Sequence, residues 1–400
     1  MKASIEKTDV AGKRVLMRVD FNVPLEEGAI TDDRRIRMSL PGISSVLTRG
    51  GKLILMSHLG RPEGTGFESS GSLKLVAERL RELLPGTTVH FPSQDCVDDA
   101  AAAAVAACKP GEVVLLENLR FHKAEKKGDA AFAAKLAAYG DIYCNDAFGT
   151  AHRADASMVA VPQAMQGRPR VAGPLMAKEI QYLQTALQNA ERPVVVILGG
   201  SKVSDKIGAI EHMGTKAGWL LIGGAMSYTL LKSMGRKVGK SLVEEKMLGT
   251  AKKLIEGFAN SPVKGMVPVD HVCGKELAQG TPVQVVGDSI PDGWMGLDIG
   301  PETVSRYTKV IDDARTVVWN GPMGAFETVP FDAGTRAIAR AVAGVTKRGG
   351  TTVVCGGDTA AAVAEFGVAD QYSHVSTGGG ASLELLEGRT FESLEVLDNA

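Results

Sequence analysis

The chain has 400 residues, more than one typical domain needs, so its length predicts two or three domains. Hydrophobic residues make up 44% of the chain and charged residues 23%, which is ordinary for a soluble globular enzyme. The formal net charge of -1 excludes a general attraction to nucleic acid or to an anionic membrane surface.

The first part of the chain alternates short apolar runs with stretches of helical pattern. The stretches LKLVAERLRELL (73–84) and DDAAAAAVAACK (98–109) are predicted helices. Because uninterrupted Val, Ile and Leu runs between helices are typical of strands buried on both faces, these runs predict a parallel sheet. The five expected strands are residues 15–19, 53–57, 88–91, 113–116 and 142–145.

The same pattern restarts in the second half and predicts a second α/β domain of similar size. Between the two series, residues 173–193 lack a strand pattern and read as one amphipathic helix bracketed by Pro174 and Pro193. We therefore expect two α/β domains joined by a linker helix. The expected strands of the second series are residues 194–198, 219–222, 283–286, 316–319 and 352–355.

The five cysteines are scattered and lack CxxC pairing. This usage favours reduced, mostly buried thiols of a cytosolic protein over a disulfide framework or a zinc site. The first residues, MKASIEKTDVAGKR, lack the apolar segment of a secretory signal, and no apolar run approaches the length of a membrane span. We expect a cytoplasmic protein. The cysteines are Cys96, Cys108, Cys144, Cys273 and Cys355.

Polar and cationic residues follow the strands of the first series. In open α/β sheets, ligands bind beyond the carboxyl ends of strands, and Arg presents a planar fork suited to phosphate and carboxylate. Convergence of these residues predicts a pocket for a small, strongly anionic molecule; surface ion pairs are the alternative. The residues are Asp20, Asn22, His58, Arg61, Arg120, His152 and Arg153, with Arg34, Arg35 and Arg37 in an expected loop at 30–37.

The strand ends of the second series are rich in glycine. Glycine lets backbone amides approach phosphate closely, and helix N-termini favour anions, so the pattern predicts a nucleotide site. Tight strand-to-helix turns are the alternative. Neither a GxxxxGK[ST] loop nor a GxGxxG turn after the first strand is present. The five ends are LGGSK (198–202), IGGAM (222–226), WNGPMGAFE (319–327), CGGDTA (355–360) and STGGGAS (376–382).

Three charged residues beside these glycines have two interpretations each. Lys202 and Lys206 are four residues apart, so on one helix they share a face and repel each other by a few tenths of a kcal/mol. They are either a solvated pair or cations for a polyanion. Asp358 is either a helix N-cap or a Mg²⁺ ligand, since nucleotide-bound Mg²⁺ needs only one or two carboxylates.

Together these motifs resemble the phosphoglycerate kinase family, in order and over almost the whole chain. The matching segments are RVDFNVPL (18–25), SHLGRP (57–62), ENLRFHKAE (117–125), NDAFGTAHRADAS (145–157), GGSKVSDKI (199–207), GLDIGPET (296–303), VVWNGPMGAFE (317–327), GGDTAAAV (356–363) and STGGGASLELL (376–386). The resemblance implies two Rossmann-like doubly wound domains. It assigns 1–174 with 390–400 to phosphoglycerate, 175–190 to the linker helix and 191–389 to the nucleotide.

The resemblance also implies site residues. For 3-phosphoglycerate or 1,3-bisphosphoglycerate these are Asp20, Asn22, Arg35, His58, Leu59, Gly60, Arg61, Arg120 and Arg153. For MgADP or MgATP they are Gly200, Lys202, Lys206, Gly224, Gly296, Asn320, Gly324, Glu327, Gly356, Gly357, Asp358 and Thr359, with Asp358 near the metal and Glu327 near the ribose. Expected catalytic cations are Arg35, Lys202 and Lys206, and expected backbone donors to the transition state are Gly378, Gly379 and Gly380.

Two positions depart from the family pattern. Ala225 stands where many members carry a third glycine, and its methyl group is expected to tighten the adenine slot. Asp155 stands where some members have histidine, and we expect it to alter the basic patch without touching any of the site residues.

The expected reaction moves a phosphoryl group between 1,3-bisphosphoglycerate and ADP. Both acceptors are anionic at neutral pH, so positioning and charge neutralisation suffice without a base. Domain closure in a monomer is the implied route. Another α/β kinase of a small phosphorylated carboxylate, a dehydrogenase and a non-enzymatic binding protein are the alternatives.

Overall fold

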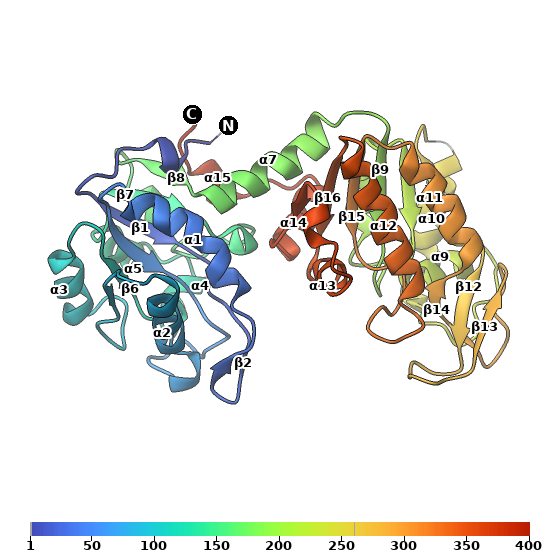
Figure 1. Ribbon diagram of the computed structural model, residues 1–400, viewed down its shortest axis with the longest axis horizontal. Helices are drawn as coiled ribbons and strands as arrows, with labels where there is room; N and C mark the ends of the chain where they lie inside the picture. Colours follow the sequence, from blue (N-terminus) through green and yellow to red (C-terminus); the bar gives the residue numbers. More distant parts are fainter. Residues whose placement is uncertain (1, 260) are drawn as a thin grey trace. The chain divides into compact units, whose positions relative to one another are not determined.

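The computed structural model describes residues 2–259 and 261–400, without the side chains of 184–188 and 259. The chain forms two compact units, Met1–Ile180 with Thr390–Ala400 (the N-terminal unit) and Gln181–Arg389 (the C-terminal unit). Each unit is built on a six-stranded parallel sheet (Figure 1). The predicted α/β fold class with two parallel-sheet, Rossmann-like domains is confirmed.

The sheet of the N-terminal unit has the strand order β5-β6-β4-β1-β7-β8, with all neighbours parallel. Val15 and Met17 of β1 pack in one core with apolar residues of α1 and α2, while Leu16 between them is also fully buried. Both faces of the sheet are therefore covered. The strands are β1 (Arg14–Arg18), β4 (Lys52–Met56), β5 (Val89–His90), β6 (Val113–Leu115), β7 (Ile142–Asn145) and β8 (Arg170–Ala172).

The helices of this unit follow its strands, and the short hairpin β2 (Leu25–Glu26) and β3 (Ala29–Ile30) precedes the first helix. Helix α1 begins at Arg34, so the three arginines predicted in a loop lie in its first turn; that expectation was wrong. The helices are α1 (Arg34–Leu47), α2 (Lys74–Leu83), α3 (Asp99–Ala107), α4 (Lys123–Lys126), α5 (Ala130–Ala137), α6 (Ala160–Ala164) and α15 (Glu392–Glu395).

The sheet of the C-terminal unit has the order β11-β10-β9-β15-β16-β17, again all parallel. Its core packs alternate residues of the central strands, such as Val195 and Val317, against α11 and α12 (Figure 1). The strands are β9 (Val194–Leu198), β10 (Trp219–Ile222), β11 (Lys264–Met266), β15 (Thr316–Asn320), β16 (Thr351–Cys355) and β17 (His374–Val375). The helices are α8 (Ile207–Met213), α9 (Met226–Ser233), α10 (Leu248–Ala259), α11 (Pro301–Asp312), α12 (Ala333–Lys347), α13 (Gly357–Glu365) and α14 (Gly380–Leu386).

One predicted strand belongs to a different sheet. Residues Val283–Val286 form β13 of a three-stranded antiparallel sheet, together with β12 (His271–Gly274) and β14 (Met295–Ile299). The expectation that β13 continues the parallel series was wrong. Val283 and Val285 are exposed, so this strand is covered on one face only, unlike the central parallel strands.

The helix α7 (Pro174–Gln188) contains the boundary between the two units, which falls between Ile180 and Gln181. At the other end of the chain, the last residues return to the N-terminal unit. Ala3 N–H donates to the carbonyl of Asp398 at 2.8 Å, and the two marked termini lie side by side (Figure 1). Arg170 Nη2 also lies 2.6 Å from the carboxylate of Asp398, which fixes this tail.

Candidate active site

In the N-terminal unit, the end of β1 meets the first turn of α1. Asp20 follows β1, and its Oδ2 accepts a hydrogen bond from Arg35 Nη1 at 3.0 Å. Asn22 N–H donates to Asp20 Oδ1, and Asn22 Oδ1 accepts from Gly60 N–H at 2.8 Å. These contacts bring four of the predicted residues together at one edge of the sheet.

His58 lies close enough to four arginines for their charges to act on it. It is buried, and burial together with the positive charges of Arg18, Arg120, Arg153 and Arg35 holds the pKa of His58 well below its usual value. Arg18 Nη2 lies 3.0 Å from His58 Nδ1. Because a guanidinium only donates, Nδ1 accepts and the ring carries its proton on Nε2. The neutral imidazole therefore offers one N–H donor.

Arg18 was missed as a site residue by sequence reasoning. It is the last residue of β1, fully buried, and donates from Nε to Ser157 Oγ at 2.8 Å. The same hydroxyl hydrogen-bonds to the buried carboxyl of Glu125, whose pKa is raised by burial although Arg18 opposes the shift. The sequence did contain a signal for this residue, because an arginine at the end of the otherwise apolar run of β1 is unusual in a buried strand and indicates a paired or functional charge.

Arg120 lies in the turn after β6 and donates from Nη1 to the carbonyl of Gly60 at 2.9 Å. Its Nη2 lies 3.7 Å from Asp155 Oδ2, and both side chains are more than nine-tenths buried. The expectation that Asp155 contacts no site residue was therefore wrong. Burial and the charge of Arg153 lower the pKa of Arg120, and Asp155 opposes this shift.

The remaining three predicted residues of this group differ in exposure, and Arg153 is half-buried. Leu59 packs in the hydrophobic core and is 2% exposed, so its side chain is closed to a ligand and only its backbone is available. Its carbonyl already accepts from Asn118 Nδ2 at 2.7 Å. Arg61 is exposed.

In the C-terminal unit, glycine loops from neighbouring strands pack directly on one another. Gly200 and Gly224 have positive φ of 103° and 65°, and a Cβ at Gly224 would lie 2.5 Å from Gly200 N. The carbonyl of Gly200 accepts from Met226 N–H at the start of α9. Any side chain at Gly224 would push the loops apart, so this glycine has a packing role as well.

A cavity of about 240 Å³ lies beyond these loops. It is lined by the glycine-rich ends of several strands, two lysines and two carboxylates, Asp205 in the turn before α8 and Asp358 at the start of α13. The predicted residues that line it are Gly200, Lys202, Lys206, Asn320, Gly356, Gly357, Asp358, Thr359, Gly379 and Gly380. Backbone amides and ammonium groups around one small cavity suit a phosphate chain.

The two lysines do not share a helix, contrary to the sequence prediction. Helix α8 begins at Ile207, and Lys206 is the residue before it. Lys206 is half-buried, hydrogen-bonds from Nζ to Asn320 Oδ1, and has a pKa lowered chiefly by burial. Lys202 is exposed. The two cations thus reach the cavity from a turn.

Three further residues at the cavity are arranged differently from expectation. Asp358 lies in the first turn of α13, whose N-cap is Gly356, so the N-cap alternative for Asp358 was wrong. Thr359 is fully buried and its hydroxyl accepts from Gly321 N–H at 2.7 Å. Gly378 N–H already donates to Ser376 Oγ at 3.0 Å, which removes it from the expected transition-state donors, whereas Gly379 and Gly380 line the cavity.

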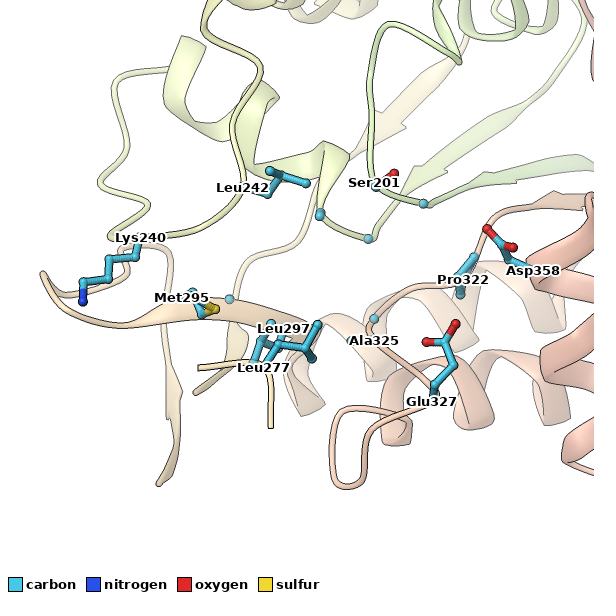
Figure 2. A pocket seen from close by; sticks show the side chains of 15 residues that line it. Ser201, Lys240, Leu242, Leu277, Met295, Leu297, Pro322, Ala325, Glu327 and Asp358 are labelled. Atoms are coloured by element: carbon cyan, nitrogen blue, oxygen red, sulfur yellow. The ribbon is translucent and has the colours of Figure 1, made fainter. Parts of the chain in front are cut away.

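A second pocket of about 440 Å³ shares Gly200, Ser201 and Asp358 with the first. Figure 2 shows Leu242, Leu277, Met295 and Leu297 in one part of it and the carboxylates of Glu327 and Asp358 in the other. The predicted Gly224, Gly296 and Gly324 also line it, as does Ala225. An apolar slot next to carboxylates and a glycine-rich cavity fits the base, ribose and phosphates of one nucleotide. Sequence reasoning missed the apolar lining, because leucine and methionine carry no functional signal by themselves.

Comparison with known proteins decides the family. The family model described as phosphoglycerate kinase matches residues 5–389. This chain belongs to the phosphoglycerate kinase family. The phosphoglycerate kinase of Rhodopirellula baltica is 55% identical over 403 residues and covers 100% of both chains. That of Synechococcus elongatus is 52% identical over 400 residues, covering 100% of this chain and 98% of its own.

Solved structures agree. The phosphoglycerate kinase of Coxiella burnetii superposes with a TM-score of 0.90 at 38% identity, covering 99% of this chain and 98% of its own. Membership makes the chain a transferase of glycolysis that moves a phosphoryl group between 1,3-bisphosphoglycerate and ADP. Its substrates are 3-phosphoglycerate and ATP in the reverse direction. Among the described residues, no helix has the length and apolarity to cross a membrane.

Proposed function

We propose that the two sites divide the reaction between them. The cluster around Arg35, His58 and Arg120 binds the phosphoglycerate, and the glycine-lined pockets bind the nucleotide. The observation that carries this division is the shared lining of the two pockets in the C-terminal unit, where an apolar slot leads into a cavity with Lys202, Lys206 and Asp358. The proposal therefore requires no nucleotide site in the N-terminal unit.

The transfer needs no general base. The carboxylate of 3-phosphoglycerate and the β-phosphate of ADP are ionised at neutral pH, so neither acceptor has a proton to lose. The buried His58 stays neutral and serves as an Nε2–H donor to the substrate. Catalysis then rests on alignment of the reacting groups and on cations around the transferring phosphoryl group.

The cations differ in their proposed roles. Arg35 and Lys206 act on the transferring phosphoryl group, because each is held in place by a polar partner, Asp20 and Asn320 respectively. Lys202 is exposed and holds nucleotide phosphate less directly. The amides of Gly379 and Gly380 line the cavity and are proposed as backbone donors.

Asp358 is the proposed Mg²⁺ ligand. Its carboxylate belongs to both pockets, and hard oxygen donors are the ligands that Mg²⁺ prefers. One protein carboxylate is enough for a metal that the nucleotide phosphates also hold, so the residues fit the ion. When bound, Mg²⁺ would neutralise phosphate charge. Glu327 lines the larger pocket, and its proposed role is to accept hydrogen bonds from the ribose hydroxyls.

Because the proposed sites lie on different units, transfer requires the units to close on each other and exclude water. We propose that the ends of α7 act as the hinge, and that the enzyme works as a cytoplasmic monomer. The domain assignment follows: 1–174 with 390–400 for phosphoglycerate, 175–190 as the linker helix and 191–389 for the nucleotide.

A coupled assay with 3-phosphoglycerate and MgATP tests the proposed function. We expect turnover that depends on both substrates and on Mg²⁺. Glycerate and 2-phosphoglycerate are the matched alternative acceptors, and turnover with either in place of 3-phosphoglycerate would favour another small-carboxylate kinase. Absence of turnover with a folded protein would overturn the proposal.

A further inference from the structure

A mixed cluster of metal-ligating side chains lies in the N-terminal unit and is not used by the transfer reaction. Among the described residues, Asp95, Cys96 and His122 are the one group of three such side chains whose ligand atoms all lie within 4.8 Å of one another. Asp95 and Cys96 precede α3, and His122 precedes α4. We propose that these three residues form a site for Zn²⁺ or a similar divalent transition metal, with a fourth position left for water.

The set of donors suits this class of ion. Thiolate sulfur, imidazole nitrogen and carboxylate oxygen are all ligands of Zn²⁺, which takes four of them tetrahedrally. Metal–ligand distances of about 2.0 to 2.3 Å place tetrahedral donors about 3.3 to 3.6 Å apart. His122 Nε2 and Asp95 Oδ1 are 3.0 Å apart in a hydrogen bond, which a bound metal would replace. The other donor atoms lie within 4.8 Å of one another, so bringing them to tetrahedral spacing needs a movement of at most about an ångström. Asp95 is free to make part of this movement, because 40% of its side chain is exposed.

Local contacts hold the ligands in position without the metal. Asp95 Oδ1 accepts from Val97 N–H at 2.8 Å, which tightens the loop around Cys96. The ring of His122 packs on Phe132 of α5, with centroids 5.0 Å apart. Preorganised ligands cost little to assemble, so the geometry favours metal binding by the folded chain.

The electrostatic surroundings of Cys96 are dominated by carboxylates. Cys96 is 1% exposed, and the charges that act on it most strongly are the carboxylates of Asp95, Glu125 and Glu117. Such surroundings oppose a free thiolate but attract a cation. Binding forms a metal–sulfur bond and releases the thiol proton to water. At Cys108, by contrast, Glu112 and Lys52 act with opposite signs.

The site would connect two segments that are separate in sequence. His122 comes two residues after Arg120, whereas Asp95 and Cys96 lie in the loop between β5 and α3. A bound metal would tie this loop to the turn that carries Arg120. We therefore expect the bound metal to stabilise the N-terminal unit, and its site to be distinct from the proposed Mg²⁺ site at the nucleotide.

Titration of chelator-treated protein with Co²⁺ tests the site, since Co²⁺ reports its ligands spectroscopically. We expect a thiolate-to-cobalt charge-transfer band and tetrahedral d–d bands that saturate at one equivalent and disappear on addition of Zn²⁺. Cys96→Ser should abolish the charge-transfer band, and Asp95→Asn and His122→Gln should weaken affinity at least about tenfold. Zn²⁺ should raise the Tm of the wild type but not of Cys96→Ser.

Cys108→Ser and His90→Gln are the matched controls, because they remove a buried thiol and a carboxylate-paired histidine outside the cluster. Both should keep the cobalt spectrum. If Cys96→Ser fails to fold, the partly exposed His122 and Asp95 variants decide the matter. A wild-type spectrum of octahedral aqua cobalt only, or a charge-transfer band that survives in folded Cys96→Ser, would overturn the proposal.

Discussion

Arg35 and Asp20 form an ion pair in which Arg35 Nη1 lies 3.0 Å from Asp20 Oδ2. The pair links the first turn of α1 to the end of β1. It orients the guanidinium before any ligand arrives, and 40% of the Arg35 side chain remains exposed to meet one. Preorganised charge of this kind costs little reorganisation during a reaction.

Arg35→Ala should lower kcat on the order of a hundredfold or more, because it removes a cation proposed to act on the transferring phosphoryl group. Steady-state kinetics in both directions measure the loss. Arg34→Ala is the matched control, since Arg34 is exposed in the same helical turn, and it should leave kcat nearly unchanged. A near-wild-type kcat in Arg35→Ala would contradict the assigned role.

Lys206→Ala should reduce kcat far more than Lys202→Ala, whose main effect should be a higher KM for the nucleotide. Lys206 is half-buried and held by Asn320, whereas Lys202 is exposed. Because burial lowers the pKa of Lys206, activity that needs its ammonium form should decline at a lower pH than for an ordinary lysine. Equal kcat losses in the two variants would argue against this division of roles.

Asp155→Asn should lower the KM for 3-phosphoglycerate several-fold and make it more sensitive to salt. The change removes a buried negative charge 3.7 Å from Arg120, so the arginine cluster attracts an anion more strongly. The same change should lower Tm, because repulsion among Arg18, Arg120 and Arg153 is then less compensated. Asp99→Asn, at an exposed carboxylate of α3, controls for net charge. An unchanged KM would show that Asp155 does not tune the site.

Asp146→Asn should change how stability depends on pH. Asp146 follows β7 and accepts from Met176 N–H at 3.0 Å, in the first turn of α7, while burial raises its pKa to about 7. Between pH 4 and pH 7 the unfolded chain loses this proton and the folded chain keeps it. The wild type therefore loses stability as pH rises through this window, on the order of a few kcal/mol.

In Asp146→Asn this loss should be absent, so in urea unfolding the stability of the variant relative to the wild type should rise between pH 4 and pH 7 and level off at higher pH. Asp141→Asn is the opposite control. Arg14 lowers the pKa of Asp141, so that variant should lose stability relative to the wild type as pH rises through the ordinary carboxyl range. A pH-independent difference for Asp146→Asn would contradict a raised pKa.

Solution scattering should detect closure of the two units. We expect the radius of gyration to fall when a nucleotide and 3-phosphoglycerate are bound together, and to change less with either alone. The physical reason is that water must leave the reacting groups before charged partners can be aligned. No compaction with both ligands bound would count against the hinge proposed in α7.

Much of the architecture could be predicted from local sequence. Continuous runs such as residues 194–198 and 316–319 become central parallel strands, because a strand buried on both faces is apolar along its whole length. The sequence also predicted that the glycine-rich strand ends gather at one place, and that the arginines after the first series gather at another. The reason is that the carboxyl ends of parallel strands meet at one edge of a sheet. The family motifs then assigned these residues to substrate and nucleotide.

Other features depend on partners far away in the chain, which local patterns do not specify. Strand β13 pairs antiparallel with β12, and only this pairing separates it from the main sheet. Arg18 meets Ser157, 139 residues later, and Asp155 meets Arg120 across a buried contact. The spacing of Lys202 and Lys206 suggested one helix that contains both, but α8 begins only at Ile207, after both lysines.

The sequence by itself determined the fold class and the residue types that follow each strand. Apolar periodicity and glycine turns involve only a few neighbouring residues, so local sequence is enough to specify them. The tertiary structure decided which charges face each other, and burial then set the neutral state of His58 and the raised pKa of Asp146. It also brought Asp95 and Cys96 to His122, although the spacing of the cysteines had argued against a metal site. Desolvation and charge interactions depend on three-dimensional proximity, so these properties emerge only when distant segments pack together.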